Sequence, residues 1–368
     1  DRIATLAWNG YRHVEIYYAV SGMGAVCHTI NPRLFPEQIV YIVNHAEDKY
    51  IFVDLTFVPL LEKLAGQIPA VKGFVIMTDA AHMPACTLPN AICYETLMAG
   101  ADDDYTWPIF DERTASSLCY TSGTTGNPKG VVFSHRSTVL HSYAICAKDG
   151  IGISNEDTIL PVVPMFHVNA WGTPYAVAMC GAKIVLPGAK MDGESLYELM
   201  EKEQVTMSLG VPTVWMMLLA YMKENKKKFS SMQRTVIGGS AAPRSMIETF
   251  EKEYNVHVIH AWGMTEMSPV GTVCSRKKKH KNISFDEQIK LQLKQGRAVY
   301  GVDMKIVDGN GKNLPWDGKA FGNLLVRGPW ITSGYFKGEG GQVVDGQGWF
   351  DTGDVATIDT DGYMQITD

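Results

Sequence analysis

The sequence lacks the features that define several protein classes. Its seven cysteines are odd in number and form no CxxC pair, which argues against a disulfide framework and against a zinc site. No apolar stretch reaches the roughly 18 residues that a membrane-spanning helix requires. The net charge of −6 gives no indication of a surface that binds nucleic acid. We therefore expect isolated buried thiols in a reducing compartment, the cytoplasm or, in a eukaryote, an organelle matrix.

What the sequence does contain suits a large folded core. Of its 368 residues 46% are apolar and 20% charged, as in ordinary globular proteins. Short Val- and Ile-rich segments alternate with helix-patterned ones, which predicts an α/β fold with a mainly parallel sheet covered by helices. The expected strands are 3–8, 50–53, 71–77, 117–121, 184–186, 206–211, 234–238 and 257–261. The expected helices are 12–23, 36–45, 58–65, 194–202 and one from about residue 138.

The pattern changes after residue 295. Short strands separated by Asp-Gly turns predict an antiparallel region, a small β-barrel, with strands at 302–307, 322–327, 355–358 and 363–366. Residues 78–114 have weak periodicity and are expected to be a long connection. The predicted domains are a first α/β subdomain (1–115), a second α/β subdomain with a phosphate loop and acyl pocket (116–294), and a small β subdomain (295–368).

The most informative segment is 120–130, YTSGTTGNPKG. An apolar strand leads into a loop of glycines and hydroxyls with one lysine. Glycines let the backbone approach a ligand closely, while hydroxyls, backbone N–H groups and Lys129 can hold phosphate oxygens. The spacing differs from a Walker A motif, because Lys129 is three residues after Gly126 and is followed by Gly130. A phosphate-binding loop of another type is predicted.

This loop closely resembles the phosphate-binding motif of the adenylate-forming superfamily, which includes acyl-CoA synthetases, firefly luciferase and peptide-synthetase adenylation domains. Four further segments resemble that family's motifs in the same order. PMFHVNAWG at 164–172 is similar to its acyl-pocket segment, and GGSAAP at 238–243 to its adenine-binding turn. AWGMTEMSP at 261–269 is similar to its core motif, and WFDTGD at 349–354 to its ribose-binding motif. The resemblance covers nearly the whole chain and implies the large N-terminal domain of that fold.

The resemblance also implies roles for single residues. Glu266 with Thr121 suits Mg²⁺, a hard cation that prefers oxygen ligands. Asp354 would accept the ribose hydroxyls, and Thr265 would hydrogen-bond the α-phosphate. His167 would orient the carboxylate or gate the tunnel; it is not expected to be a general base, because a carboxylate is already ionised at neutral pH.

The complete implied sets are as follows. The catalytic residues are Thr121, Lys129, Thr265, Glu266 and His167. The nucleotide-binding residues are Thr121, Ser122, Gly123, Thr124, Thr125, Gly126, Lys129, Gly239, Ser240, Ala241, Ala261, Trp262, Gly263, Met264, Thr265 and Asp354. The acyl-binding residues are His167, Val168, Trp171, Gly238, Gly239, Trp262 and Pro269.

The implied activity is the activation of a carboxylic acid with ATP and Mg²⁺ to an acyl-adenylate, followed by thioester formation with CoA and release of AMP. The partners are a small acid and CoA, and homodimers are common in the group. Residues 29–35 and 164–172 most resemble medium-chain acyl-CoA synthetases and 3-(methylthio)propionate–CoA ligases. Trp171 and Trp262 would narrow an acyl tunnel in favour of short or medium chains.

Three alternatives stay open beside this hypothesis. A peptide-synthetase adenylation domain, with a carrier protein as acceptor, usually has an acidic residue early in the core, and residues 165–172 contain none. A luciferase-like enzyme that uses oxygen shares the adenylation half. A non-catalytic nucleotide binder is the third alternative, and the presence of Lys129, Glu266 and Asp354 argues against it.

Other expectations concern the chain ends and two local segments. Asp368 resembles the hinge before the family's mobile C-terminal domain, which carries the adenylation lysine, and the start resembles a trimmed N-terminus. The 368-residue chain is therefore expected to bind nucleotide but to catalyse poorly. Asn323 stands where the family commonly has Glu, which puts one local contact in doubt. The basic run 276–281 is expected to be a solvated loop.

Overall fold

The computed structural model describes residues 1–121 and 126–367. These residues form two compact units, each assembled from three stretches of chain. Unit 1 comprises Asp1–Arg136, Pro164–Ala170 and Tyr335–Glu339. Unit 2 comprises Ser137–Val163, Trp171–Gly334 and Gly340–Asp368. The division into three subdomains expected from the sequence stays a prediction.

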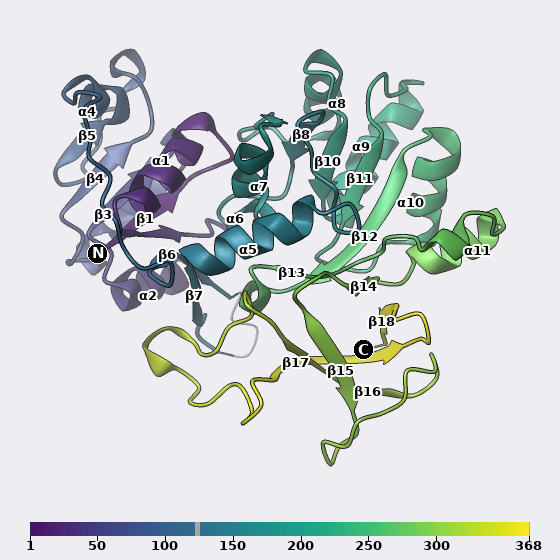
Figure 1. Cartoon of the computed structure of the whole chain (residues 1–368). Helices are drawn as coiled ribbons and strands as arrows, with labels where there is room; N and C mark the ends of the chain where they lie inside the picture. The colour runs from purple at the N-terminus through teal and green to yellow at the C-terminus, as the bar shows by residue number, and fades with distance from the viewer. Residues whose placement is uncertain (122–125, 368) are drawn as a thin grey trace. The chain divides into compact units, whose positions relative to one another are not determined.

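Within the described residues, unit 1 contains a seven-stranded sheet in the order β5-β4-β3-β1-β2-β6-β7, drawn in purple and blue in Figure 1. Neighbouring strands are parallel except for the antiparallel hairpin of β6 and β7. The strands are β1 (Arg2–Leu6), β2 (Val26–Thr29), β3 (Tyr50–Val53), β4 (Gly73–Ile76), β5 (Ala91–Cys93), β6 (Ala115–Tyr120) and β7 (Gly130–Ser134).

Helices cover both faces of this sheet. One face packs against α2 (Pro36–Ala46) and α3 (Val58–Leu64), whose buried residues share a core cluster with Leu6 of β1. The other face carries α1 (Tyr11–Gly22), where His13 Nε2 lies 2.8 Å from the hydroxyl of Thr5, the residue before Leu6. Because successive strand residues point to opposite faces, these two contacts place α1 and α2 on opposite sides. A short α4 (Tyr94–Ala99) follows β5.

Unit 2 contains a second sheet in the order β14-β13-β12-β11-β10-β8-β9, drawn from teal to green in Figure 1. The strands from β9 to β12 are parallel, whereas β13 and β14 are antiparallel to their neighbours. The strands are β8 (Thr158–Pro161), β9 (Lys183–Ile184), β10 (Met207–Gly210), β11 (Arg234–Ile237), β12 (His257–Gly263), β13 (Val270–Val273) and β14 (Arg297–Ala298).

The helices around this sheet bury Trp215, Leu218 and Phe250 in one core. Asp192 caps α8 by accepting a hydrogen bond from Ser195 N at 2.9 Å, and Ser284 with Glu287 forms a capping box on α11. The helices that follow β7 in the chain are α5 (His135–Cys146), α6 (Val168–Trp171), α7 (Thr173–Cys180), α8 (Gly193–Lys202), α9 (Pro212–Glu224), α10 (Arg244–Glu248) and α11 (Phe285–Gln292). The first two residues of α5 and the first three of α6 belong to unit 1.

The C-terminal part of unit 2 is an antiparallel half-barrel in the order β15-β16-β17-β18, coloured from green to yellow in Figure 1. Asp308 and Asp359 begin tight turns by accepting backbone N–H groups two and four residues ahead. The strands are β15 (Asp303–Val307), β16 (Phe321–Arg327), β17 (Phe350–Ile358) and β18 (Met364–Ile366). The antiparallel character predicted after residue 295 is confirmed.

One local prediction was wrong, and a second was incomplete. Residues 78–114 are not a plain connection, because they contain β5, which pairs with β4, and α4. The basic run 276–281 is not simply solvated, because Lys277 Nζ and Lys279 Nζ lie 3.4 and 2.5 Å from the Asp361 carboxylate. The run thus holds the turn between β17 and β18. The limits of the other predicted strands and helices agree with the structure to within a few residues, but several elements were not predicted, among them β2, β8, β13, α7, α9 and α11.

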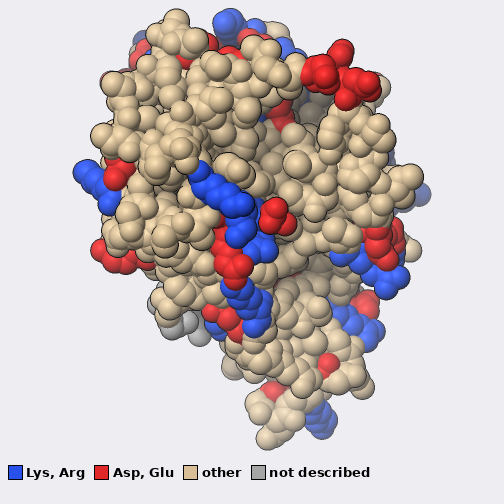
Figure 2. Space-filling view, turned by 90° about the vertical axis from the view of Figure 1, so that its left-hand side faces the viewer, with Lys and Arg blue, Asp and Glu red and all other residues tan. Residues whose placement is uncertain are grey.

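Surface charge is mixed in sign. Figure 2 shows one face on which Lys and Arg lie among Asp and Glu and many neutral residues. In the part of the chain that the structure describes, no helix is long and apolar enough to cross a membrane.

Asn323, which stands where the resemblance led us to expect Glu, is exposed on β16, opposite Val307 of β15.

Candidate nucleotide-binding site

A glycine turn follows the carboxyl end of β11. Gly239 has φ +76°, a conformation that residues with a side chain rarely adopt. A Cβ on Gly238 would lie 3.0 Å from the Trp171 ring and 3.1 Å from the carbonyl oxygen of Ala261. Backbone conformation at Gly239 and lack of space at Gly238 therefore explain why both positions are glycine. The turn lies directly against Trp171.

His260 supports this turn from below. Its Nε2 accepts a hydrogen bond from Ala242 N at 3.4 Å, and its Nδ1 lies 3.0 Å from the carbonyl oxygen of Gln292. This pair of contacts requires the neutral tautomer with the proton on Nδ1. Burial lowers the pKa of His260, although the backbone oxygens of Gln292 and its neighbours act in the opposite direction. A neutral, fully buried imidazole thus fixes the end of the turn.

The carboxyl end of β12 forms the adjacent wall. The strand continues to Gly263, two residues beyond its predicted end, so that Trp262 lies within it. A Cβ on Gly263 would lie 2.0 Å from the carbonyl oxygen of Pro269, which shows how tightly the chain folds back on itself. Thr265 and Glu266 follow on a short buried turn, 7% and 6% exposed.

Asp354 of β17 closes this region. Its Oδ2 accepts a hydrogen bond from the indole Nε1 of Trp262 at 3.0 Å. Burial raises the pKa of Asp354, and the Trp262 hydrogen bond partly offsets that rise. The walls enclose a cavity of about 420 Å³. Its lining residues are Gly239, Ser240, Ala241, His260, Ala261, Trp262, Gly263, Met264, Gln295, Thr352, Asp354 and Ile366.

The base of the predicted phosphate loop lies in unit 1. Thr121 N donates to the carbonyl oxygen of Lys129 at 3.0 Å, and Thr121 Oγ1 accepts from Lys129 N at 3.1 Å. The ammonium of Lys129 lies 4.9 Å from the centre of the Tyr335 ring. Gly126 lies in the turn before β7, and Ser122, Gly123, Thr124 and Thr125 fall outside the described residues.

The predicted acyl segment begins in unit 1 with a left-handed turn. Val168 to Trp171 have φ between +45° and +57°. Asn169 anchors the turn to β6, because its Nδ2 donates to Ser117 Oγ at 3.0 Å and its Oδ1 accepts from Cys119 Sγ at 3.3 Å. Val168 packs in a small core cluster with Cys119.

His167 precedes this turn and is partly buried. Burial lowers its pKa, and the positive charge of Arg33 lowers it further. The imidazole is therefore neutral at pH 7, which agrees with a role in orienting a carboxylate by hydrogen bonding.

Within unit 2 the structure brings together residues from three predicted motifs. The turn 239–241, residues 261–264 and Asp354 line one cavity. Trp171 and Gly238 lie against its glycine turn, and Pro269 packs on Gly263 outside the lining. Thr121, Lys129 and His167 belong to unit 1.

Sequence reasoning missed His260 and Asn169. His260 lies in an apolar strand, where a histidine is usually part of the core. Its position directly before Ala261, the first residue of a predicted nucleotide-binding segment, was the signal that could have identified it. Asn169 lies inside a motif that was noticed for its aromatic residues. Thr352, Gln295 and Ile366 of the cavity wall were also missed.

Comparisons with known proteins identify a family and similar sequences. The family described as AMP-binding enzyme matches residues 1–336. Medium-chain-fatty-acid–CoA ligase of Ectopseudomonas oleovorans is 56% identical over all of this chain and 67% of its own length. 3-Methylmercaptopropionyl-CoA ligase of Ruegeria lacuscaerulensis is 54% identical over all of this chain and 68% of its own length.

Solved structures share the fold. Anthranilate CoA ligase AuaEII in complex with anthranoyl-AMP superposes with a TM-score of 0.85 at 22% identity, over all of this chain and 67% of that chain. The N-terminal domain of FACL13 from Mycobacterium tuberculosis superposes with a TM-score of 0.83 at 23% identity, over all of this chain and 86% of that one.

Proposed function

The chain belongs to the AMP-binding enzyme family, and we propose that it forms the acid- and nucleotide-binding part of an AMP-forming acyl-CoA ligase. The observation that carries this proposal is the cavity of unit 2, where a glycine turn, a tryptophan and an aspartate surround about 420 Å³. The whole reaction belongs to the complete protein, because this chain spans about two thirds of the length of its curated relatives.

The cavity suits an adenosine moiety. The turn 239–241 offers a flat backbone surface for adenine, where a side chain on Gly239 would be strained and would crowd Val211. Asp354 would accept the ribose hydroxyls, and its bond from Trp262 holds the carboxyl group in place. Thr265 would hydrogen-bond the α-phosphate from the buried turn at the end of β12.

Residues 121–130 would bind the remaining phosphates. Lys129 supplies a positive charge, and Thr121 keeps the base of the loop closed. Glu266 and Thr121 offer oxygen donors of the kind that Mg²⁺ prefers, together with substrate phosphates and water. When bound there, Mg²⁺ would neutralise charge that develops on the phosphates.

The proposed chemistry has two steps. In the first, a carboxylate oxygen bonds to the α-phosphorus of ATP while the bond to the bridging oxygen breaks and pyrophosphate leaves. In the second, the CoA sulfur attacks the acyl carbon, AMP leaves, and the thiol proton passes to solvent. Neutral His167 would hold the carboxylate in the first step, whereas Lys129 and Thr265 stabilise phosphate charge.

We propose a short- or medium-chain acid, including 3-(methylthio)propionate, as the substrate. Trp171 supports this choice because its ring packs against Gly238 and occupies space beside the glycine turn. The names of two relatives above 50% identity point the same way. A reducing compartment such as the cytoplasm is proposed from the seven free cysteines, and a homodimer from the resemblance alone.

Pyrophosphate release tests the proposal. The complete protein would be assayed with ATP and Mg²⁺ against acids from acetate to dodecanoate and 3-(methylthio)propionate, each with and without CoA. Release that rises with CoA and peaks at one chain length is expected. Release indifferent to CoA would favour a carrier protein or oxygen as acceptor, and the absence of release with every acid would favour a non-catalytic nucleotide binder.

A further inference from the structure

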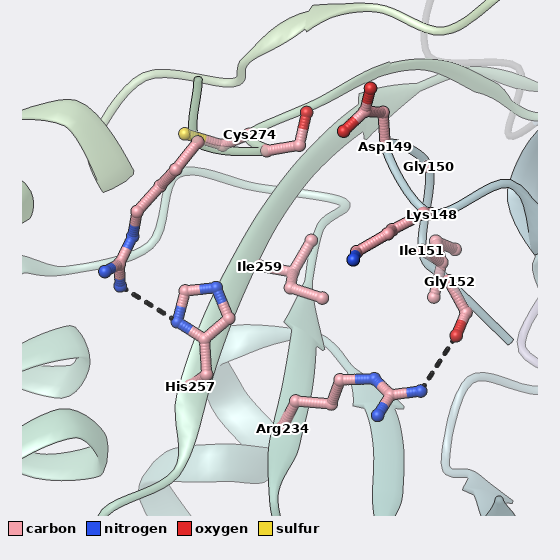
Figure 3. Close-up of a pocket in the computed structure, with 11 residues that line it drawn as sticks. Lys148, Asp149, Gly150, Ile151, Gly152, Arg234, His257, Ile259 and Cys274 are labelled. Atoms are coloured by element: carbon pink, nitrogen blue, oxygen red, sulfur yellow. Dashed lines mark hydrogen bonds between the residues drawn. The ribbon is translucent and has the colours of Figure 1, made fainter. Parts of the chain in front are cut away.

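A second cavity of unit 2, of about 480 Å³, lies at the amino ends of β11 and β12 (Figure 3). Arg234 and His257 are the first residues of these strands, and Lys148 comes from the segment after α5. The adenosine-type cavity lies at the carboxyl ends of the same strands. We propose that the amino-end cavity is a separate binding site for a phosphate group, carried by inorganic phosphate or by a small phosphomonoester.

Lys148 provides the least compensated cation. Its ammonium points into the cavity, whereas the carboxylate of the adjacent Asp149 points in a different direction (Figure 3). Its side chain makes no ion pair or hydrogen bond with the rest of the described chain. A primary ammonium with three N–H donors can therefore turn fully toward a ligand oxygen.

Arg234 provides a fixed donor along one wall. Its Nη2 donates to the carbonyl oxygen of Gly152 at 2.9 Å and to Asp157 at 2.7 Å. These bonds orient the guanidinium, and its buried Nε has no partner among the described residues. Figure 3 shows this side chain extending along the cavity toward Gly152. The guanidinium held in this way presents a fixed positive charge to the cavity that it lines.

His257 and Arg276 form the opposite wall. The Nδ1 of His257 lies 2.8 Å from Glu251 Oε1 and 3.1 Å from Arg276 Nη2. Burial acts to raise the pKa of Glu251, but hydrogen bonds from His257, Val258 and Gln292 outweigh it and lower that pKa. Ionised Glu251 thus holds both side chains, and Arg276 Nε is a second buried donor without a partner in the described chain.

The charge balance selects the class of ligand. Arg234 and Arg276 are paired with Asp157 and Glu251, and the unpaired Lys148 is equalled in formal charge by Asp149, so the cavity has no strong net field. Recognition then depends on directed, charge-assisted hydrogen bonds to a compact oxyanion, not on long-range attraction of a polyanion. The apolar side chains of Ile151 and Ile259 and the volume leave room for an organic part beside one phosphate.

The test is a titration of the complete protein with inorganic phosphate, glucose 6-phosphate and glucose, read by calorimetry. Hydrogen exchange locates the site through peptides that cover 148–152 and 257–259. Lys148→Gln and Arg276→Gln should each weaken binding about fivefold or more, the loss expected for one charge-assisted hydrogen bond at a partly exposed site. Lys278→Gln is the matched control, because this exposed lysine is in the same basic run as Arg276 but outside the cavity.

The outcomes separate clearly. Tighter binding of glucose 6-phosphate than of phosphate identifies a phosphomonoester site, and equal binding identifies a phosphate site. Equal affinity of the Lys148→Gln and Lys278→Gln proteins, or exchange protection confined to other segments, would overturn the proposal. The result does not depend on the ligase activity proposed above, because neither binding nor exchange requires turnover.

Discussion

The two ends of β11 and β12 are built on opposite principles. At the carboxyl ends, the shape of the cavity comes from backbone: two glycines, a tight approach of Gly263 to Pro269, and a buried neutral histidine under the turn. At the amino ends, shape and chemistry come from long charged side chains, of which Arg234 and Arg276 are held by the carboxylates of Asp157 and Glu251.

This difference decides how each end responds to change. Where a cavity is formed by backbone, the surrounding atoms cannot yield to an added methyl group, because they belong to the strands and to the turns that connect them. In a cavity formed by side chains, the backbone stays in place when one charge is removed. The oppositely charged partner, however, is left without compensation. Substitutions at the two ends should therefore separate stability from ligand affinity.

The largest effect is expected from Gly263→Ala. The added Cβ would lie 2.0 Å from the carbonyl oxygen of Pro269, so strand and turn must separate. Overpacking of this kind should lower the unfolding free energy by about 3 kcal/mol. Urea denaturation followed by tryptophan fluorescence measures it. Gly309→Ala, where nothing lies within 4 Å, is the control, and equal midpoints for the two variants would contradict the account.

Asp157→Asn should have the next largest effect and should act at the amino ends alone. The Asp157 side chain is 4% exposed and accepts from Arg234, Ser154 and Thr206. Loss of its charge should cost about 2 kcal/mol of stability while leaving AMP affinity within about twofold. Asp149→Asn, at the exposed edge of the same cavity, should change neither quantity. A large loss of AMP affinity in Asp157→Asn would show that the two ends are coupled.

Asp354→Asn should lower AMP affinity and leave stability nearly unchanged, the opposite of Asp157→Asn. The amide oxygen can still accept from Trp262, so stability should change little, but charge-assisted bonds to ribose hydroxyls are lost. AMP affinity should fall about tenfold, the usual size for a hydrogen bond to a charged group. Calorimetric titration measures this, with Asp351→Asn on the same strand as control. Unchanged affinity in Asp354→Asn would remove ribose binding from its proposed role.

The smallest effect is a pH dependence. Burial lowers the pKa of His141 to about 3, while its Nε2 accepts from Val270 N at 3.1 Å. The unfolded chain binds the proton near pH 6.5, so this histidine stabilises the fold above that pH and stops doing so as pH falls below it. Between pH 7.5 and 5.5, the His141→Gln protein should lose about 1 kcal/mol less unfolding free energy than the wild type.

The resemblance to known motifs singled out the turn 239–241 and residues 261–264, and these segments line one cavity. They lie next to each other because β11 and β12 are parallel neighbours, whose carboxyl ends meet at one edge of the sheet. The amino-end cavity was not predicted, because its charged residues are spread from Lys148 to Arg276 and only the sheet order brings them together.

The missed secondary structure has a related cause. β5 is three residues long with a half-exposed pattern, and its pairing with β4 creates a strand that its own residues hardly specify. The ion pairs of the basic run were not predicted, because the acidic partner of Lys277 and Lys279 is Asp361, far along the chain.

The assignment of Pro164–Ala170 and Tyr335–Glu339 to unit 1 has a consequence for dissecting the protein. The short segment 335–339 lies between β16 and β17 in sequence, yet Tyr41 donates to Glu339 at 2.8 Å and Lys337 pairs with Glu47 at 2.6 Å. The chain passes from one unit to the other after residues 136, 163, 170, 334 and 339. No single cut in the polypeptide can therefore release unit 1 or unit 2 intact. Circular permutation or gene splitting must keep segments 164–170 and 335–339 with unit 1.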